Sequence, residues 1–372
     1  MKTDYGIRIK RLRRTIKKSG FDTMMVLVEE NRRYLSGFTG EDGSCDESAG
    51  ALFVSMDNCV LATDSRYELQ AQQEAFLFDV YCYREGLPQA LPEILSKLKT
   101  KTLGFESNRL TVGQYGKMKE QLHAKKIDVD LVETQDVVEN LRVIKSKEEI
   151  GNIQQALSVA EYAFKAFREV IRPGMTEKEA AWELEKCMHE AGAQRPSFPT
   201  IVASGPNSAL PHAIPGDRRL RRQEPILFDW GVKLNGYCSD ISRTVCLGAA
   251  DETFQKVFET VLKAQRKAID AIKPEVSTRH VDAIARNFIE NKGFKGKFGH
   301  GLGHGAGLAV HEYPRVSPYH EKSLKAGMVF TVEPGIYLPG WGGVRLENMV
   351  AVGKEGARVL NVSNPLEFLI EV

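Results

Sequence analysis

The feature that most constrains this sequence is a set of four carboxylic acids in strand-like segments, three of which, Asp229, Glu333 and Glu347, interrupt apolar runs. Two of them, Asp229 and Asp240, flank the pair Asn235-Gly236, which is typical of a β-hairpin turn. A two-residue turn on this pair makes the aspartates diagonal neighbours, whereas a turn centred between residues 234 and 235 makes them direct partners. In both registers the side chains share one face of the hairpin, and a slip of one residue would separate them.

A second hairpin near the end of the sequence repeats the pattern. Segments 329–337 and 344–350 flank a glycine-rich turn, and a turn centred on Gly340 places Glu333 and Glu347 opposite each other. Carboxylates that converge within a few ångströms repel one another, so they must share protons or bind cations. Two divalent cations would balance the four negative charges, and we therefore interpret the two hairpins as the frame of a dinuclear metal site.

Candidate histidine ligands lie in and just after a glycine-rich segment, residues 299–307, which contains His300 and His304 and is followed by His311. Oxygen ligands alone would suit magnesium or calcium, whereas a histidine ligand favours manganese, cobalt, iron or zinc. The segment also fits a relaxed Gly-x-Gly-x-x-Ala dinucleotide-binding spacing, but no strand-helix unit surrounds it. We expect its small residues to let the backbone approach a ligand closely.

Composition excludes several other classes of protein. The 372 residues carry 51 basic and 49 acidic side chains, so a net charge of +2 gives no reason to expect a partner such as nucleic acid. No apolar run approaches the roughly 18 residues of a membrane span, and the first 20 residues contain no signal-peptide core. The six cysteines are too sparse for a disulfide scaffold. We therefore expect a reduced, cytoplasmic protein that does not bind membranes.

The order of predicted elements indicates two domains, an α/β domain over residues 1–133 and an α+β domain over residues 134–372. The first begins with a basic amphipathic helix at 4–20, whose charged side chains we interpret as a solvated face. In the second, Thr176 starts a helix through a capping box with Glu179. Expected strands are 24–28, 52–54, 59–62, 78–83, 103–105, 127–131, 200–203, 225–229 and 237–247; expected helices are 65–74, 88–98, 111–123, 147–170, 252–272 and 278–291.

These residues, in their order, resemble the metal ligands of the pita-bread metallopeptidases, a family that includes Xaa-Pro dipeptidases, aminopeptidase P and, more distantly, methionine aminopeptidase. The matching motifs are Phe-Asp-Trp-Gly, Tyr-Cys-Ser-Asp-Ile-Ser-Arg-Thr, Gly-His-Gly-Ala-Gly, Thr-Val-Glu-Pro-Gly and Arg-Leu-Glu-Asn, which contain Asp229, Asp240, His304, Glu333 and Glu347. The resemblance covers residues 140–372 strongly. Residues 1–133 are similar to the creatinase/prolidase N-terminal domain, through Tyr-Leu-Ser-Gly-Phe-Thr-Gly at 34–40. The resemblance as a whole implies an α/β N-terminal domain followed by a pita-bread α+β catalytic domain.

The resemblance also implies a role for each metal ligand. Asp229 would bind one of two divalent cations, and His304 and Glu333 would bind the other. Asp240 and Glu347 would bridge the pair. The cations would be manganese, cobalt, zinc or iron.

Four further roles follow from the resemblance. His212 and His311 would flank the scissile carbonyl and hydrogen-bond to its oxygen. Arg315 would receive the C-terminal carboxylate of the substrate, and Phe198 would form part of the wall of the amino-side pocket. Glu333 would carry a proton from water to the leaving nitrogen.

The function that the resemblance implies is metal-dependent hydrolysis of the Xaa-Pro bond of a small peptide, by an Xaa-Pro dipeptidase that forms a homodimer. Aminopeptidase P, which acts on longer Xaa-Pro peptides, is the alternative, but the chain is short for that enzyme and Arg315 suits a dipeptide. Methionine aminopeptidases generally lack a large N-terminal domain. Creatinase and the non-catalytic pita-bread scaffolds lose metal ligands, whereas all five are present here.

Overall fold

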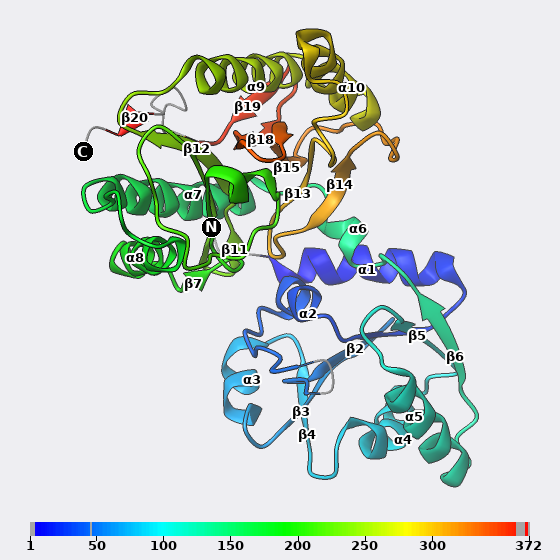
Figure 1. The fold of residues 1–372 in the computed structure, drawn as a ribbon. Helices are drawn as coiled ribbons and strands as arrows, with labels where there is room; N and C mark the ends of the chain where they lie inside the picture. Colours follow the sequence, from blue (N-terminus) through cyan, green and yellow to red (C-terminus); the bar gives the residue numbers. More distant parts are fainter. Residues whose placement is uncertain (1–3, 45–46, 362–368, 371–372) are drawn as a thin grey trace. The chain divides into compact units, whose positions relative to one another are not determined.

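A computed structural model describes residues 4–44, 47–361 and 369–370 (Figure 1). The chain divides into two compact units, Met1–Arg142 and Val143–Val372. Cys45 lies outside the described residues, and the other five cysteines are free thiols. Within the described part of the chain, no helix has both the length and the apolarity that crossing a membrane requires.

The first unit is built on a six-stranded mixed sheet with the strand order β4-β3-β2-β1-β5-β6. Its strands are β1 (Thr23–Val26), β2 (Ala51–Ser55), β3 (Cys59–Asp64), β4 (Asp79–Tyr83), β5 (Thr102–Glu106) and β6 (Asp130–Thr134). β1 pairs antiparallel with β2 and parallel with β5. Parallel neighbours need crossover connections, and α3 (Glu68–Glu74), α4 (Leu87–Leu98) and α5 (Val112–Ala124) provide them. The α/β architecture predicted for this part of the chain is confirmed.

The basic helix α1 (Tyr5–Ser19) buries the predicted apolar face formed by Ile9, Leu12 and Ile16. One of its basic residues departs from the expected solvated face: Arg8 is buried, and its Nη1 donates to the Tyr34 carbonyl at 2.8 Å. Two further helices, α2 (Glu29–Ser36) and α6 (Glu139–Arg142), were not predicted. Both are short and rich in charged residues, so neither has the apolar periodicity that sequence analysis detects.

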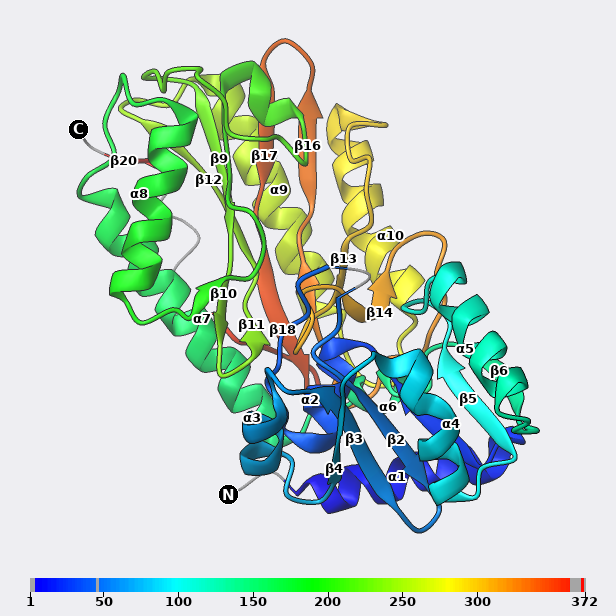
Figure 2. The same cartoon turned by 90° about the horizontal axis from the view of Figure 1, so that it is seen from below.

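The second unit places two pairs of helices around strands that carry the acids. The helices are α7 (Lys147–Arg168), α8 (Glu177–Glu190), α9 (Glu252–Asp270) and α10 (Thr278–Ile289), and α8 begins with the predicted Thr176 capping box. In Figure 2, α7 and α8 lie beside the strands of the first hairpin, whereas α9 and α10 lie on the side of the second. The second hairpin and helices α9 and α10 share one apolar core.

The strands of the second unit form two groups. The first contains β7 (Arg195–Pro196), β8 (Ile201–Ser204), β9 (Pro225–Trp230), β10 (Val232–Leu234), β11 (Tyr237–Cys238), β12 (Ile241–Leu247) and β20 (Leu369–Ile370). The second contains β13 (Gly303–Gly305), β14 (Glu312–Val316), β15 (Val329–Val332), β16 (Gly335–Leu338), β17 (Gly342–Arg345), β18 (Asn348–Val352) and β19 (Ala357–Val359). Both predicted hairpins are present, β9–β12 and β15–β18.

The register of the first hairpin decides between the two predicted alternatives. Asn235 and Gly236 have φ values of 52° and 80°, as a two-residue hairpin turn requires. Asp229 pairs with Ser242, so Asp240 is its diagonal neighbour. The continuous strand expected at 237–247 is wrong, because the ladder stops at Ser239 and Asp240 before β12 begins.

In the second hairpin the predicted register is confirmed. The pairs Val332–Asn348 and Gly335–Arg345 flank the acids, so Glu333 lies opposite Glu347. The two continuous strands that we expected are each interrupted beside the acid, because Pro334 has no N–H to return the bond that its carbonyl accepts from the Leu346 N–H at 3.4 Å. Each hairpin therefore contains an irregular step close to its acids.

Candidate active site

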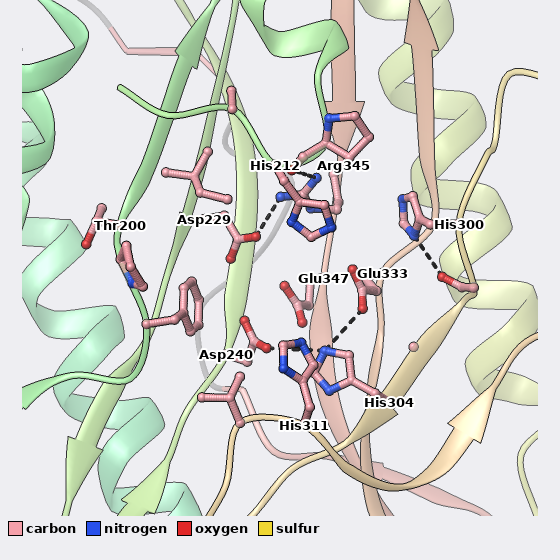
Figure 3. A pocket seen from close by; sticks show the side chains of 18 of the residues that line it. Thr200, His212, Asp229, Asp240, His300, His304, His311, Glu333, Arg345 and Glu347 are labelled. Atoms are coloured by element: carbon pink, nitrogen blue, oxygen red, sulfur yellow. Dashed lines mark hydrogen bonds and ion pairs between the residues drawn. The ribbon is translucent and has the colours of Figure 1, made fainter. Parts of the chain in front are cut away.

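All the side chains predicted for the site line one cavity of about 630 Å³ in the second unit. A cavity of this size is typical of a small-ligand site. Figure 3 shows the acids pointing toward one another from facing strands. The predicted residues on the cavity wall are Phe198, His212, Asp229, Asp240, His304, His311, Arg315, Glu333 and Glu347.

The acid cluster leaves buried oxygen atoms unpaired. Ligand oxygens of Asp229, Asp240 and Glu347 lie within 4.8 Å of one another. Among the described residues, Oδ1 of Asp229 and Oε1 of Glu347 are buried and have no hydrogen-bond partner. Buried polar atoms are nearly always paired, so this geometry fits a cation between the carboxylates.

Burial and mutual repulsion disfavour bare negative charge in this cluster. Burial, followed by the charges of Glu347 and Asp229, raises the pKa of Asp240 well above its ordinary value. Burial also raises the pKa of Glu333 to about 8, and the pKa of Glu347 is raised by burial and by Glu333. A bound cation would remove this penalty, because it offsets both the desolvation and the repulsion.

His304 presents an unprotonated nitrogen to the same acids. Burial, followed by the charge of His311, lowers the pKa of His304 to about 3, so its imidazole is neutral. Its Nδ1 lies 3.1 Å from the Gly305 carbonyl, which assigns the proton to Nδ1 and leaves a lone pair on Nε2. That Nε2 lies 3.5 Å from Oδ2 of Asp240 and from Oε1 of Glu333. Because the ring is neutral, these contacts are not ion pairs, and a cation would satisfy all three atoms.

The glycines around His304 allow its strand to fit tightly between two others. A Cβ on Gly303 would lie 1.9 Å from the Thr331 carbonyl oxygen, and one on Gly305 would lie 2.1 Å from the Tyr313 carbonyl oxygen. We expected the small residues to admit a ligand, whereas these two glycines admit the neighbouring strands. No helix follows β13 in the manner of a dinucleotide-binding unit, since β14 is the next element among the described residues.

Arg345 is a part of the site to which sequence analysis assigned no role. Its side chain is buried, and Nη2 donates to Oδ2 of Asp229 at 2.6 Å. Its Nε donates to Oγ of Ser242 at 2.8 Å, and that hydroxyl donates to Oε2 of Glu347 at 2.8 Å. The available signal was a charged residue in an apolar strand, two positions before Glu347 and therefore on the same face.

His300, a candidate ligand in the sequence, forms hydrogen bonds with groups other than the acids. Its Nδ1 lies 2.8 Å from the Gly301 carbonyl, and its Nε2 lies 2.8 Å from the Tyr337 hydroxyl. Burial, followed by the charge of Arg345, lowers the pKa of His300 to about 3. The Tyr337 hydroxyl also accepts from Nη1 of Arg345 at 3.0 Å, so His300 lies at the end of a hydrogen-bonded chain that leads to Asp229.

The predicted substrate-contacting residues surround the acids from several segments. His212 comes from the loop before β9, and the ring of His311 is tilted by 58° against that of His304, with ring centres 4.3 Å apart (Figure 3). Arg315 is the cross-strand partner of His304 in the β13–β14 pair. Cross-strand partners project to the same side of a sheet, which explains why the exposed Arg315 lines the same cavity.

Comparison with known proteins agrees with this geometry. The model of metallopeptidase family M24 matches residues 151–354, and that of the creatinase/prolidase N-terminal domain matches residues 8–144. The chain is 38% identical over 355 residues to the Xaa-Pro dipeptidase of Pyrococcus furiosus, and the aligned region covers 95% of this chain and 97% of that enzyme.

Solved structures of similar proteins extend over nearly the whole chain. The Xaa-Pro dipeptidase of Bacillus anthracis has a TM-score of 0.92 and 36% identity, covering 99% of this chain and 100% of that one. The X-Pro aminopeptidase of Thermotoga maritima has a TM-score of 0.86 and 36% identity, covering 96% and 100%. The chain therefore belongs to metallopeptidase family M24, with a creatinase/prolidase N-terminal domain ahead of a pita-bread catalytic domain.

Proposed function

We propose that this metallopeptidase is an Xaa-Pro dipeptidase. The observation that carries the proposal is that Arg315, a cationic side chain, lies directly across the β13–β14 pair from His304 and lines the cavity that holds the acids. A dipeptide has its carboxylate one residue beyond the scissile bond, so a positively charged side chain close to the reacting centre suits a dipeptide substrate. Relatives in Pyrococcus furiosus and Bacillus anthracis that bear this name support the same substrate class.

The residues that would hold two divalent cations are the convergent ligand set Asp229, Asp240, His304, Glu333 and Glu347. A site that combines one imidazole with carboxylates suits manganese, cobalt, iron or zinc better than calcium. When bound, the cations supply Lewis-acid polarisation of the scissile carbonyl and increase the acidity of water near neutral pH.

The protein's own groups perform the remaining steps of the proposed hydrolysis. The hydroxyl of Thr331 donates to Oε1 of Glu333 at 3.1 Å and fixes the orientation of that carboxylate. Glu333 would accept a proton from the attacking water at its carboxylate and deliver it to the prolyl nitrogen as the C–N bond breaks. His212 and His311 would each donate an N–H to the carbonyl oxygen as negative charge develops there.

Proline as the leaving residue agrees with this arrangement. Its amide nitrogen has no N–H and its φ is fixed, so a peptidase does not need a backbone acceptor at that position. Recognition then depends on the ring and on the terminal carboxylate, which Arg315 would bind through its planar guanidinium. Phe198, on the cavity wall, would contact the residue before proline.

Peptide cleavage tests the proposal directly. Purified protein, loaded with Mn²⁺ or Co²⁺ or treated with a chelator, is given an Xaa-Pro dipeptide and an Xaa-Pro-Xaa tripeptide, and proline or peptide release is measured. We expect metal-dependent cleavage of the dipeptide, and Arg315→Met should lower its kcat/KM by roughly 10- to 100-fold because a charged hydrogen bond of about 1.5–3 kcal/mol is lost. Absence of dipeptide cleavage by the metal-loaded protein would refute the assignment.

Aminopeptidase P is the second candidate. It is favoured by the similarity to the Thermotoga maritima enzyme and by the exposure of Arg315, which leaves room beyond a prolyl residue. The same assay separates the two, since cleavage of the tripeptide with little effect of Arg315→Met would identify an aminopeptidase.

A further inference from the structure

The ladder of the second hairpin is incomplete beside Glu333 and Glu347. The Glu333 N–H donates to the Leu302 carbonyl at 2.8 Å, and the Glu347 N–H donates to the Ser242 carbonyl at 3.1 Å. The two strands thus bond outward, to different neighbours, at the position where their carboxylates face the cavity. In the adjacent pair of the ladder, the Leu346 N–H donates to the Pro334 carbonyl at 3.4 Å, but proline has no N–H to return the bond. The Leu346 carbonyl therefore needs a donor from elsewhere.

One side chain supplies this donor and also contacts the facing strand. Nε2 of Gln265, on α9, donates to the Val332 carbonyl at 3.0 Å and to the Leu346 carbonyl at 2.8 Å. These carbonyls belong to the residues that directly precede Glu333 and Glu347. The amide nitrogen carries two hydrogens, so it can bind one carbonyl of each strand at once.

The amide of Gln265 is a polar group buried in apolar surroundings. Gln265 is completely buried on a helix whose neighbouring residues form the apolar core. Its Oε1 is buried without a hydrogen-bond partner among the described residues, which makes the side chain costly for stability alone. The geometry therefore calls for a role beyond core packing.

We infer that Gln265 is a positioning residue for the metal centre, because it fixes the separation of the two strands that deliver Glu333 and Glu347. Without the amide, the two strands would lose this link beside the acids, and the Leu346 carbonyl would be left without a donor. The strands would then adjust at this point, and the direction of the carboxylates would change. This inference rests on the metal centre of the proposed function but is independent of specificity for proline.

Metal affinity is the measurement that separates positioning from core stability. Gln265→Met has a similar volume and lacks donors, whereas Gln265→Asn keeps the amide and retracts it by one methylene. Val261→Ala, at a completely buried position on the same helix, is the control for lost stability. The Kd for Mn²⁺ is measured by calorimetry on the full chain, and the absorption spectrum of the Co²⁺-loaded protein reports on ligand geometry.

We expect both Gln265 variants to raise the Mn²⁺ Kd, by roughly 10- to 100-fold for Gln265→Met, as is usual when a residue that orients metal ligands is removed. Val261→Ala should retain the Kd of the parent protein despite a lower Tm. If Gln265→Met does not fold, Gln265→Asn carries the test. Parent-like Mn²⁺ binding by the folded Gln265 variants, or an equal loss in Val261→Ala, would overturn the inference; a parent protein that binds no Mn²⁺ would overturn the metal centre as well.

Discussion

Glu177 holds together both ends of the loop that carries His212, and its replacement gives a sharp test of how that loop is positioned. The carboxylate is completely buried at the start of α8. Oε1 accepts from the Ser204 N–H at 2.8 Å and from the Ser204 hydroxyl at 2.9 Å. Oε2 accepts from the Gly216 N–H at 3.0 Å, and Nδ2 of Asn207 reaches both oxygens, at 3.1 and 3.2 Å.

Glu177→Gln should lose only the hydrogen bonds of one oxygen. The amide oxygen can replace Oε1 and retain the bonds from Ser204, whereas the NH₂ group would face the donors of Gly216 and Asn207. Hydrogen bonds to a charged acceptor contribute about 1.5–3 kcal/mol each, so two losses correspond to about 3 kcal/mol or slightly more after relaxation of the loop. Release of the loop at Gly216 should also displace His212, with a fall in kcat/KM on the order of 10- to 100-fold.

Urea unfolding and steady-state kinetics measure the two effects on the same preparation. Glu179→Gln is a matched control, because this exposed residue belongs to the capping box of the same helix and glutamine suits that role. Hydrogen exchange at Gly216 should become faster in Glu177→Gln only. A loss of stability below about 1 kcal/mol, with unchanged exchange at Gly216, would refute the view that this carboxylate holds the loop.

Three further outcomes are expected. Chelation of the metals should lower Tm in calorimetry, and Mn²⁺ at 100 times its Kd should restore about 2.7 kcal/mol of stability through linkage; an unchanged Tm would contradict the acid-cluster interpretation. Arg345→Met should destabilise the protein by about 3 kcal/mol in urea unfolding, since it leaves Asp229 with an unpaired buried oxygen. Burial, followed by the charge of Glu139, raises the pKa of Glu106 from 4.5 to about 7, so its contribution to stability is greatest below pH 4.5 and is lost as the pH rises through 7. Between pH 5 and 8 the unfolding free energy of the parent protein should therefore fall more than that of Glu106→Gln. The difference between the two falls should be about 3 kcal/mol.

The convergence of the acids could be predicted because it depends on local geometry. Side chains alternate along a strand, so a turn sequence determines which residues share a face. Asn235-Gly236 indicates a two-residue turn, one of the two registers that the sequence left open, and the structure contains this turn. The second hairpin, whose turn has no such pair, was still correct in register because Glu333 and Glu347 are equally distant from Gly340.

The surroundings of the acids could not be predicted, because they depend on contacts between distant parts of the chain. Arg345 lies 116 residues from Asp229, and Gln265 lies 67 residues from Val332. The spacing of Val261, Gln265 and Ala268 places the glutamine on the apolar face of its helix, but the pattern does not show which carbonyls its amide contacts. The break beside Glu333 and Glu347 has a local cause instead, since Pro334 has no N–H to complete the ladder pair with Leu346.

Asp229 and Glu347 share an arrangement that explains how a repulsive cluster can be specific for a cation. In Asp229, Oδ2 is held by Arg345 while Oδ1 has no partner among the described residues. Glu347 repeats this arrangement, with Oε2 held by Ser242 and Oε1 unpaired. One oxygen of each carboxylate is thus anchored by a protein donor, and this anchor fixes the direction of the other. Carboxylates that share protons bind them more readily when they are free to turn toward one another. Anchored carboxylates are instead preorganised for ions of fixed size and coordination.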